Sequence, residues 1–205
     1  CACRGTSGFA HVSCLAEQVK ILMDEAEENN LDDKALQERW NRWDKCSLCE
    51  QEYHGVVAGA LGWACWKTYV GRPETDWNRL DAMNQLGNGL SGAGHNEHAL
   101  SVREAELSVK RRIGASAEGI LVVQTNLANS YQKLGRLETV LPLRRDVYFG
   151  FSKLVGEEDE STLLAACNYA NSLIGLKRFE EAKSLTRKTM PVARRALGEH
   201  KDIML

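Results

Sequence analysis

The hydrophobic and polar positions along the chain follow a helical pattern rather than the strict alternation of a half-buried strand. Residues that favour helices dominate from Ala16 onward, and β-branched residues hardly alternate with polar ones. Only three prolines occur in the chain. The pattern predicts a mainly α-helical protein without a long sheet.

Three helices are expected before residue 76. Residues 15–28 and 31–43 are acidic and amphipathic, and each stretch predicts one helix. Residues 53–70 are mostly apolar and small, with aromatic side chains at three-residue spacing at Trp63, Trp66 and Tyr69. We expect a buried capping helix and a linker over residues 54–75, covering the apolar flank of the repeats that follow.

The rest of the chain repeats itself. The sequence Asn126-Leu-Ala-Asn-Ser-Tyr131 recurs 42 residues later as Asn168-Tyr-Ala-Asn-Ser-Leu173, and a weaker copy around Asn88 precedes it by 41 residues. Gly94, Gly135 and the Lys177-Arg178 pair mark a turn between two helices in each unit. A helical hairpin of this size cannot bury both faces alone, so the units are expected to stack into an α-solenoid.

These recurring segments resemble the tetratricopeptide repeat in its longer form, as found in kinesin light chains. The resemblance implies three units, at about residues 76–117, 118–159 and 160–205. HEAT repeats have a similar length, but the small residues Gly87, Ala128 and Ala170 at the hairpin contact favour the tetratricopeptide form. The last unit stops where another repeat would start, which indicates truncation at this end.

In tetratricopeptide arrays the first helices line a concave groove that binds an extended peptide, so the resemblance implies a protein or peptide partner. An amide side chain suits this task because it both donates and accepts hydrogen bonds. The alternative is that these amides only bond neighbouring helix termini. The candidate partner-binding residues are Gln85, Asn88, Asn126, Asn129, Asn168 and Asn171.

Five of the seven cysteines crowd the first quarter of the chain in close pairs beside a histidine. This spacing favours zinc over disulfides and therefore a reducing, cytoplasmic compartment. The alternative is a set of buried or free thiols beside a core histidine. The candidate metal ligands are Cys1, Cys3, His11, Cys14, Cys46 and Cys49.

The order of these ligands resembles the later part of a RING-CH (RING-variant) domain, over residues 1–53. The resemblance implies that Cys1, Cys3, Cys46 and Cys49 share one Zn²⁺, while a pair formed by His11 and Cys14 holds half of a second site. A four-cysteine site is closed, so its zinc would stabilise the fold rather than catalyse a reaction. The chain begins on a ligand cysteine and lacks the upstream pair, which suggests a fragment of a longer protein.

RING-CH domains also imply a ubiquitin-conjugating enzyme as partner and E3 ubiquitin ligase activity, with the repeats recruiting substrate. In many of these domains a tryptophan helps dock that enzyme, but this chain has Gln18 in its place. Trp40 and Trp43 could substitute for it, or could instead pack over the zinc-binding module. We therefore expect a non-catalytic interaction module first and a ligase as the alternative.

The composition argues against a nucleic acid or a membrane as the partner. The net charge is −2 and 26% of residues are charged with both signs, so no basic field exists to hold a nucleic acid or an anionic membrane. The longest apolar run, residues 56–66, is too short to cross a bilayer. No nucleophile–base pair or phosphate-binding loop indicates a hydrolase or transferase.

Overall fold

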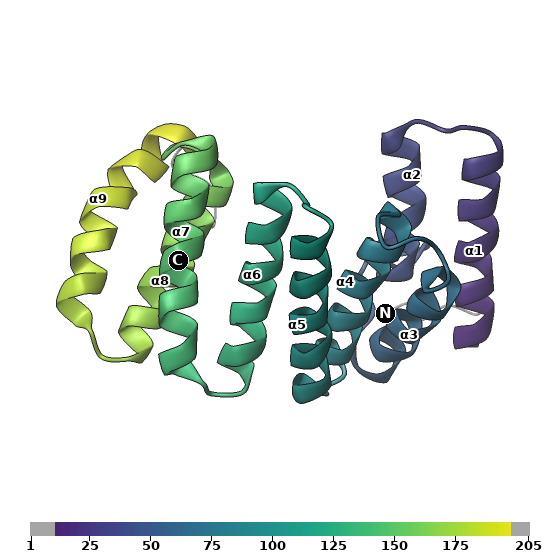
Figure 1. The fold of residues 1–205 in the computed structure, drawn as a ribbon, viewed down its shortest axis with the longest axis horizontal. Helices are drawn as coiled ribbons and strands as arrows, with labels where there is room; N and C mark the ends of the chain where they lie inside the picture. Colours follow the sequence, from purple (N-terminus) through teal and green to yellow (C-terminus); the bar gives the residue numbers. More distant parts are fainter. Residues whose placement is uncertain (1–10, 198–205) are drawn as a thin grey trace. The chain divides into compact units, whose positions relative to one another are not determined.

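The structure is a computed structural model that describes residues 11–197 and divides the chain into two compact units, residues 1–106 and 107–205 (Figure 1). The helices are α1 (Val12–Glu28), α2 (Asp33–Trp40), the short 3-10 helix η1 (Asn41–Trp43), α3 (Gly55–Tyr69), α4 (Trp77–Gly92), α5 (Asn96–Arg112), α6 (Ala117–Lys133), α7 (Leu137–Val155), α8 (Glu160–Gly175) and α9 (Phe179–Leu197). Between residues 11 and 197, β pairing is limited to one isolated bridge, Lys45 to Glu52. The mainly α-helical prediction is confirmed.

The first unit has a core to which α1, α2, η1 and α3 all contribute, and α2, η1 and α3 supply its aromatic side chains. The Asp32 carboxylate accepts a hydrogen bond from the Ala35 amide at 2.8 Å and so caps the start of α2. The ring of Tyr69 on α3 lies with its centroid 5.3 Å from that of Trp40 and 6.4 Å from that of Trp43. Both tryptophans therefore serve the core of this unit.

Helices α3 and α4 pack with their backbones in contact, because glycines line both sides of the seam. A Cβ atom added at Gly89 of α4 would lie 2.5 Å from the carbonyl oxygen of Ala58, and one added at Gly62 of α3 would lie 3.0 Å from that of Gln85. No side chain fits at Gly89 without a shift of the backbone, and one at Gly62 would make an unusually tight contact. The apolar segment that we expected to cap the repeats thus lies directly against the first helix of the first hairpin.

Gly87 makes room for a side chain of α5 rather than for a close approach of the two helices. A Cβ atom there would lie 2.7 Å from the guanidinium carbon of Arg103, so this glycine leaves room for an arginine of α5. The close apolar contact in this hairpin comes from Leu86 and Leu90, which pack against Ala99. The α4–α5 hairpin is thus held by an apolar contact and, beside it, a buried charged side chain.

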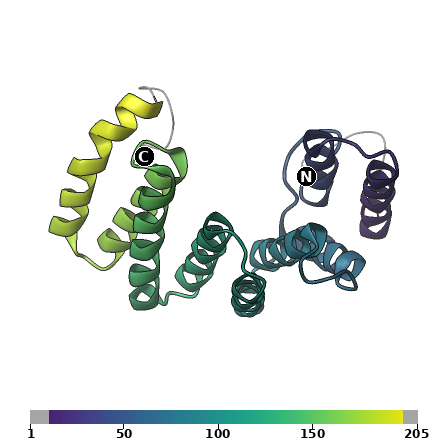
Figure 2. The ribbon, with the colours of Figure 1, turned by 45° about the horizontal axis from the view of Figure 1, so that its top comes forward.

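The second unit contains the end of α5 and the helices α6 to α9, of which each packs on the next in chain order (Figure 2). One core cluster of this unit comprises Leu121, Val147, Tyr148, Phe151, Ala165 and Ala166, and another comprises Leu141, Leu173 and Ala182. Among the described helices of both units, none is long and apolar enough to cross a lipid bilayer.

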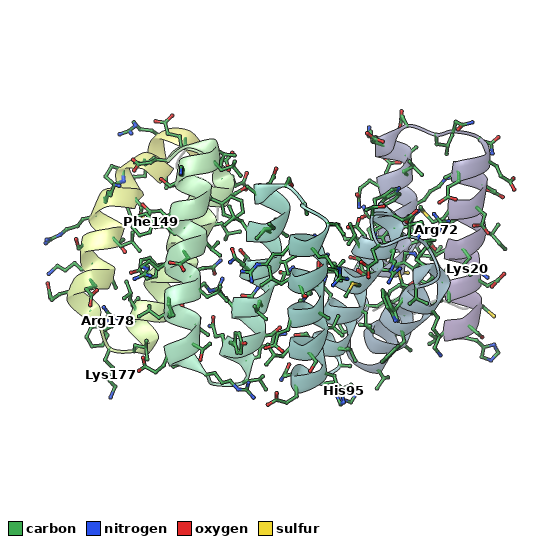
Figure 3. The ribbon with its side chains drawn as sticks, viewed as in Figure 1. Lys20, Arg72, His95, Phe149, Lys177 and Arg178 are labelled. Atoms are coloured by element: carbon green, nitrogen blue, oxygen red, sulfur yellow. The ribbon has the colours of Figure 1, made fainter. Side chains whose placement is uncertain are left out.

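The three hairpin turns share one hydrogen bond, repeated at the spacing of the sequence repeat. In each turn a backbone amide just before the second helix donates to a carbonyl oxygen in the last turn of the first helix. The distances are 2.9 Å from His95 to Leu90, 3.0 Å from Arg136 to Tyr131 and 2.9 Å from Arg178 to Leu173. Between these pairs stand Gly94 (φ 83°), Gly135 (φ 72°) and Lys177 (φ 59°). Lys177 and Arg178 mark the α8–α9 turn in Figure 3, where a lysine takes the left-handed conformation that glycine adopts in the other two turns.

Candidate functional site

The structure leaves three of the six candidate amides exposed at the surface. Asn88, Asn129 and Asn171 are exposed and lie near the ends of α4, α6 and α8, the first helices of the three hairpins. Asn126 and Asn168 are half-buried one turn earlier, and Gln85 is buried. A ligand can therefore reach one asparagine in each hairpin directly.

In the α4–α5 hairpin the exposed asparagine is held from behind by a buried arginine. Arg103 donates from Nη2 to Asn88 Oδ1 and from Nη1 to Asn84 Oδ1, the latter at 2.5 Å. The same Nη1 atom lies 3.0 Å from Glu106 Oε2, and the two charged side chains are 3% and 1% exposed. Burial lowers the pKa of Arg103, and the Glu106 carboxylate opposes that shift.

The α6–α7 hairpin repeats this arrangement without the carboxylate. Arg144, which is 2% exposed, donates from Nη2 to Asn129 Oδ1 at 2.5 Å and to Gln132 Oε1 at 3.2 Å. Val147 stands at the repeat position of Glu106. The buried Nε and Nη1 atoms of Arg144 have no hydrogen-bond partner, and burial lowers the pKa of this guanidinium to about 10.

The α8–α9 hairpin lacks the arginine altogether. Thr186 occupies the repeat position of Arg144, and its hydroxyl donates to the carbonyl oxygen of Ala182 at 2.9 Å within α9. Asn171 is therefore exposed without a guanidinium behind it. The sequence pattern alone does not single out Arg103 or Arg144, although both stand 15 residues after the exposed asparagine of their hairpin. That constant spacing is the signal that could have found them.

Cys46 and Cys49 lie in a tight loop before α3, and a backbone amide of this loop points at a cysteine sulfur. The amide of Leu48 points at Cys46 Sγ at 3.5 Å, and the amide of Glu50 donates to the Cys46 carbonyl oxygen at 3.0 Å. Glu50 has a φ of 57°, and the Cys46 amide closes the loop on Gln51 at 2.9 Å. A backbone amide directed at a cysteine sulfur is a contact that suits a metal ligand.

The other predicted ligands are placed less completely. His11 Nδ1 and Cys14 Sγ lie 3.9 Å apart on the exposed start of α1, while Cys1 and Cys3 lie outside the described residues. Within residues 11–197 no group of three or more histidine, cysteine or acidic side chains is arranged to hold a metal ion. The described part of the chain thus contains one close pair of candidate ligands, His11 and Cys14, and the loop that carries Cys46 and Cys49. The four-cysteine site stays a prediction.

Comparisons with known proteins bear on the fold. No protein-family profile matches this sequence, and no curated protein does. Among solved structures, BtubC (BKLC) from P. vanneervenii is similar over 95% of this chain and 78% of its own, with a TM-score of 0.65 and 12% identity. A Podosopora anserina kinesin light chain protein with nearly identical TPR-like repeats is similar over 92% of this chain and 99% of its own, with a TM-score of 0.57 and 16% identity.

The fold is that of TPR-like repeats. At 12% and 16% identity these likenesses concern the fold alone. They confirm the α-solenoid of tetratricopeptide-like hairpins that the sequence repeats predict. The resemblance to RING-CH domains has no counterpart in these comparisons and stays a prediction.

Proposed function

We propose that this chain is a protein-interaction module whose TPR-like hairpins bind an extended peptide through the exposed asparagines of their first helices. The observation that carries the proposal is the recurrence of Asn88, Asn129 and Asn171 at the same helical position in three hairpins, exposed each time. An asparagine at a fixed position can bond the backbone of a peptide of any sequence. In two of the three hairpins a buried arginine donates a hydrogen bond to that asparagine and so fixes its orientation. The arginine itself does not reach the surface.

A selection from a displayed library of random peptides tests this function. Peptides enriched on the purified chain should bind the double variant Asn129→Ala/Asn171→Ala at least about tenfold more weakly, because each lost hydrogen bond is worth about 1 kcal/mol. Gln37→Ala, which removes an exposed amide from α2, is the matched control and should bind as the wild type does. Failure to enrich any peptide, or equal affinity for the double variant, would contradict the proposal.

We also propose a structural Zn²⁺ in the amino-terminal part of the chain, held by Cys1, Cys3, Cys46 and Cys49. The backbone amide aimed at Cys46 Sγ and the left-handed Glu50 support it, because both suit a metal-binding loop. When bound, the ion would supply folding energy and no reactive water, since four thiolates leave no open position. Such thiolates require a reducing compartment, which is the ground for proposing a cytoplasmic location.

Metal analysis of the purified chain checks the zinc proposal. About one zinc per chain is expected from one complete four-cysteine site. The double variant Cys46→Ser/Cys49→Ser should lose this zinc, whereas Cys167→Ser, a substitution in α8, should retain it. A wild-type chain without zinc, or a double variant that keeps it, would rule the site out.

Ubiquitin ligase activity is the alternative function, and the structure offers it little support. Gln18 is exposed on α1 where the RING-CH resemblance places a docking tryptophan. Trp40 and Trp43, the side chains that could replace it, are 6% and 1% exposed. An autoubiquitination assay with a panel of conjugating enzymes separates the two functions, because ubiquitin chains that disappear on Cys46→Ser would favour the ligase.

A further inference from the structure

An open hollow of about 830 Å³ lies along α9 and takes one lining residue, Ile174, from α8. Ile174 and Phe179 are 50% and 59% exposed, and Met190 and Pro191 continue the apolar lining farther along α9. Large apolar side chains gathered in a concave surface mark a place where another protein element packs. A helix that lays its apolar side into a groove is one such element.

The same hollow is lined by arginine and lysine side chains, most of which have no carboxylate partner in the described part of the chain. Arg195 lies 3.6 Å from Glu158, whereas the lining cations without a partner are Lys183, Arg187 and Arg194. Lys188, which is on α9 but does not line the hollow, donates to Glu157 at 2.7 Å. The positive charge that the chain leaves unbalanced on α9 is therefore concentrated around the apolar hollow.

Helix α1 presents the opposite chemistry. Ile21 is 50% exposed, and it is followed on the same side of α1 by Asp24 and Glu28, which are also exposed. Neither of these two carboxylates pairs with a cation between residues 11 and 197, although each of the other carboxylates of α1 does. Ile21, Asp24 and Glu28 thus form an acidic ridge with one apolar side chain.

The acidic ridge and the hollow agree in spacing as well as in charge. The two carboxylates of the ridge are four residues apart, as are Lys183 and Arg187, so each pair spans about 6 Å along its helix. Ile21 lies three residues before the carboxylates, and Met190 lies three residues after the cations. A helix that runs antiparallel to α9 in the hollow can therefore bring each carboxylate to a cation and Ile21 to Met190.

We propose that the hollow on α9 of one copy of this chain binds the acidic ridge on α1 of a second copy. The two surfaces differ, so the contact is heterologous and the copies associate head to tail. A second α9 does not suit the hollow, because two surfaces with the same excess of positive charge repel each other. None of the three exposed asparagines lines the hollow, so the proposal goes beyond the peptide-binding function and does not depend on it.

Sedimentation velocity of the whole chain at increasing concentration tests the proposal. The average mass should rise with concentration at low ionic strength and return toward that of the monomer in high salt, because salt screens attraction between exposed charges. Ile21→Ser, which leaves the charge unchanged, should weaken the association about tenfold. A chain that stays monomeric up to about 1 mM would overturn the proposal and leave the hollow to an acidic helix of a different protein.

Reversal of the charges identifies the two surfaces. The double variants Asp24→Lys/Glu28→Lys and Lys183→Glu/Arg187→Glu should each associate at least about tenfold more weakly than the wild type, because each sets like charges against each other. The chain that combines all four substitutions should associate as the wild type does. Association that persists in either double variant, or that the combined chain does not recover, would overturn the proposal.

A matched control separates this contact from an effect of net charge. Glu38→Lys/Glu118→Lys changes the net charge by the same amount as the α1 variant, but at exposed positions on α2 and α6. It should associate as the wild type does, and a loss equal to that of the α1 variant would refute the specific contact. Peptides selected for the proposed function should bind the combined chain unchanged, so the two proposals can fail separately.

Discussion

The guanidinium of Arg103 lies 3.0 Å from the carboxylate of Glu106, and both side chains are almost completely buried in the α4–α5 hairpin. A buried ion pair is costly to break from one side, because the remaining charge has lost its water and its partner together. Arg103→Met should therefore lower the free energy of unfolding by about 3–5 kcal/mol, measured by urea denaturation.

Arg144→Met is the matched comparison and should behave differently. No described carboxylate is left behind by this substitution, and the side chains that Arg144 bonds, Asn129 and Gln132, are exposed and can bond water instead. The free energy of unfolding should fall by no more than about 1 kcal/mol or should rise. A loss as large as that of Arg103→Met would show that Arg144 is balanced after all.

The glycine seam between α3 and α4 predicts opposite effects for two neighbouring substitutions. Gly89→Ala forces a methyl group to within 2.5 Å of a backbone oxygen and should cost about 2 kcal/mol or more. Gly92→Ala meets only an ordinary contact of 3.7 Å, so its better helix propensity should stabilise α4 by about 0.5–1 kcal/mol. Thermal unfolding of the two variants measures both effects, and similar melting temperatures would refute the close approach.

The α8–α9 turn offers a stabilising substitution. Lys177 holds a φ of 59°, a conformation that strains any residue with a Cβ atom. Lys177→Gly should raise the free energy of unfolding by about 0.5–1 kcal/mol, and Lys177→Ala, which keeps the Cβ atom, should not. Calorimetry on the three proteins distinguishes this conformational effect from the loss of the lysine charge, which both variants share.

The ion pair between α1 and the loop after α3 should make stability depend on acid pH. Arg72, labelled in Figure 3, donates to both carboxylate oxygens of Glu27 at 2.8 and 3.0 Å and so holds the pKa of Glu27 below its ordinary value of 4.5. Because the folded chain binds this proton less readily than the unfolded chain, the contribution is complete above pH 4.5 and is lost as the pH falls through the lowered pKa.

Melting temperatures of the wild type and of Glu27→Gln, followed from neutral to acid pH, measure this effect. The wild type should be more stable at neutral pH by no more than about 1 kcal/mol, since both partners are partly exposed. The difference should vanish in acid. Glu28→Gln, one residue away and exposed, is the control, and a difference that does not change with pH would contradict the ion pair.

Local pattern predicts most of the fold of this chain. The turns at Gly94 and Gly135 can be predicted because glycine tolerates a positive φ. The third turn, at Lys177, can be predicted from its place in the repeat. The exposed asparagines follow from the same recurrence. These features depend on short stretches of sequence, so periodicity is enough to locate them.

The buried arginines behind Asn88 and Asn129 could not be predicted in the same way. Whether an arginine on a helix turns inward or outward depends on what the neighbouring helix leaves open, and Gly87 leaves that space for Arg103. Neighbouring arginines show the difference, because Arg144 is buried while Arg145 is exposed and pairs with Asp146. The predicted zinc site depends on Cys1 and Cys3, which lie outside the described residues, so local pattern gives only its Cys46–Cys49 half.

The backbone contact between α3 and α4 has a practical meaning for anyone dissecting the protein. A shortened chain that starts at Trp77 would leave α4 with a bare strip of main chain around Gly89, where no side chain shields it from water. The smallest piece that keeps this hairpin covered therefore starts ahead of Gly55 and includes all of α3. Helix α3 and the first hairpin therefore form one packed body, whatever boundary a comparison of sequence motifs would draw between them.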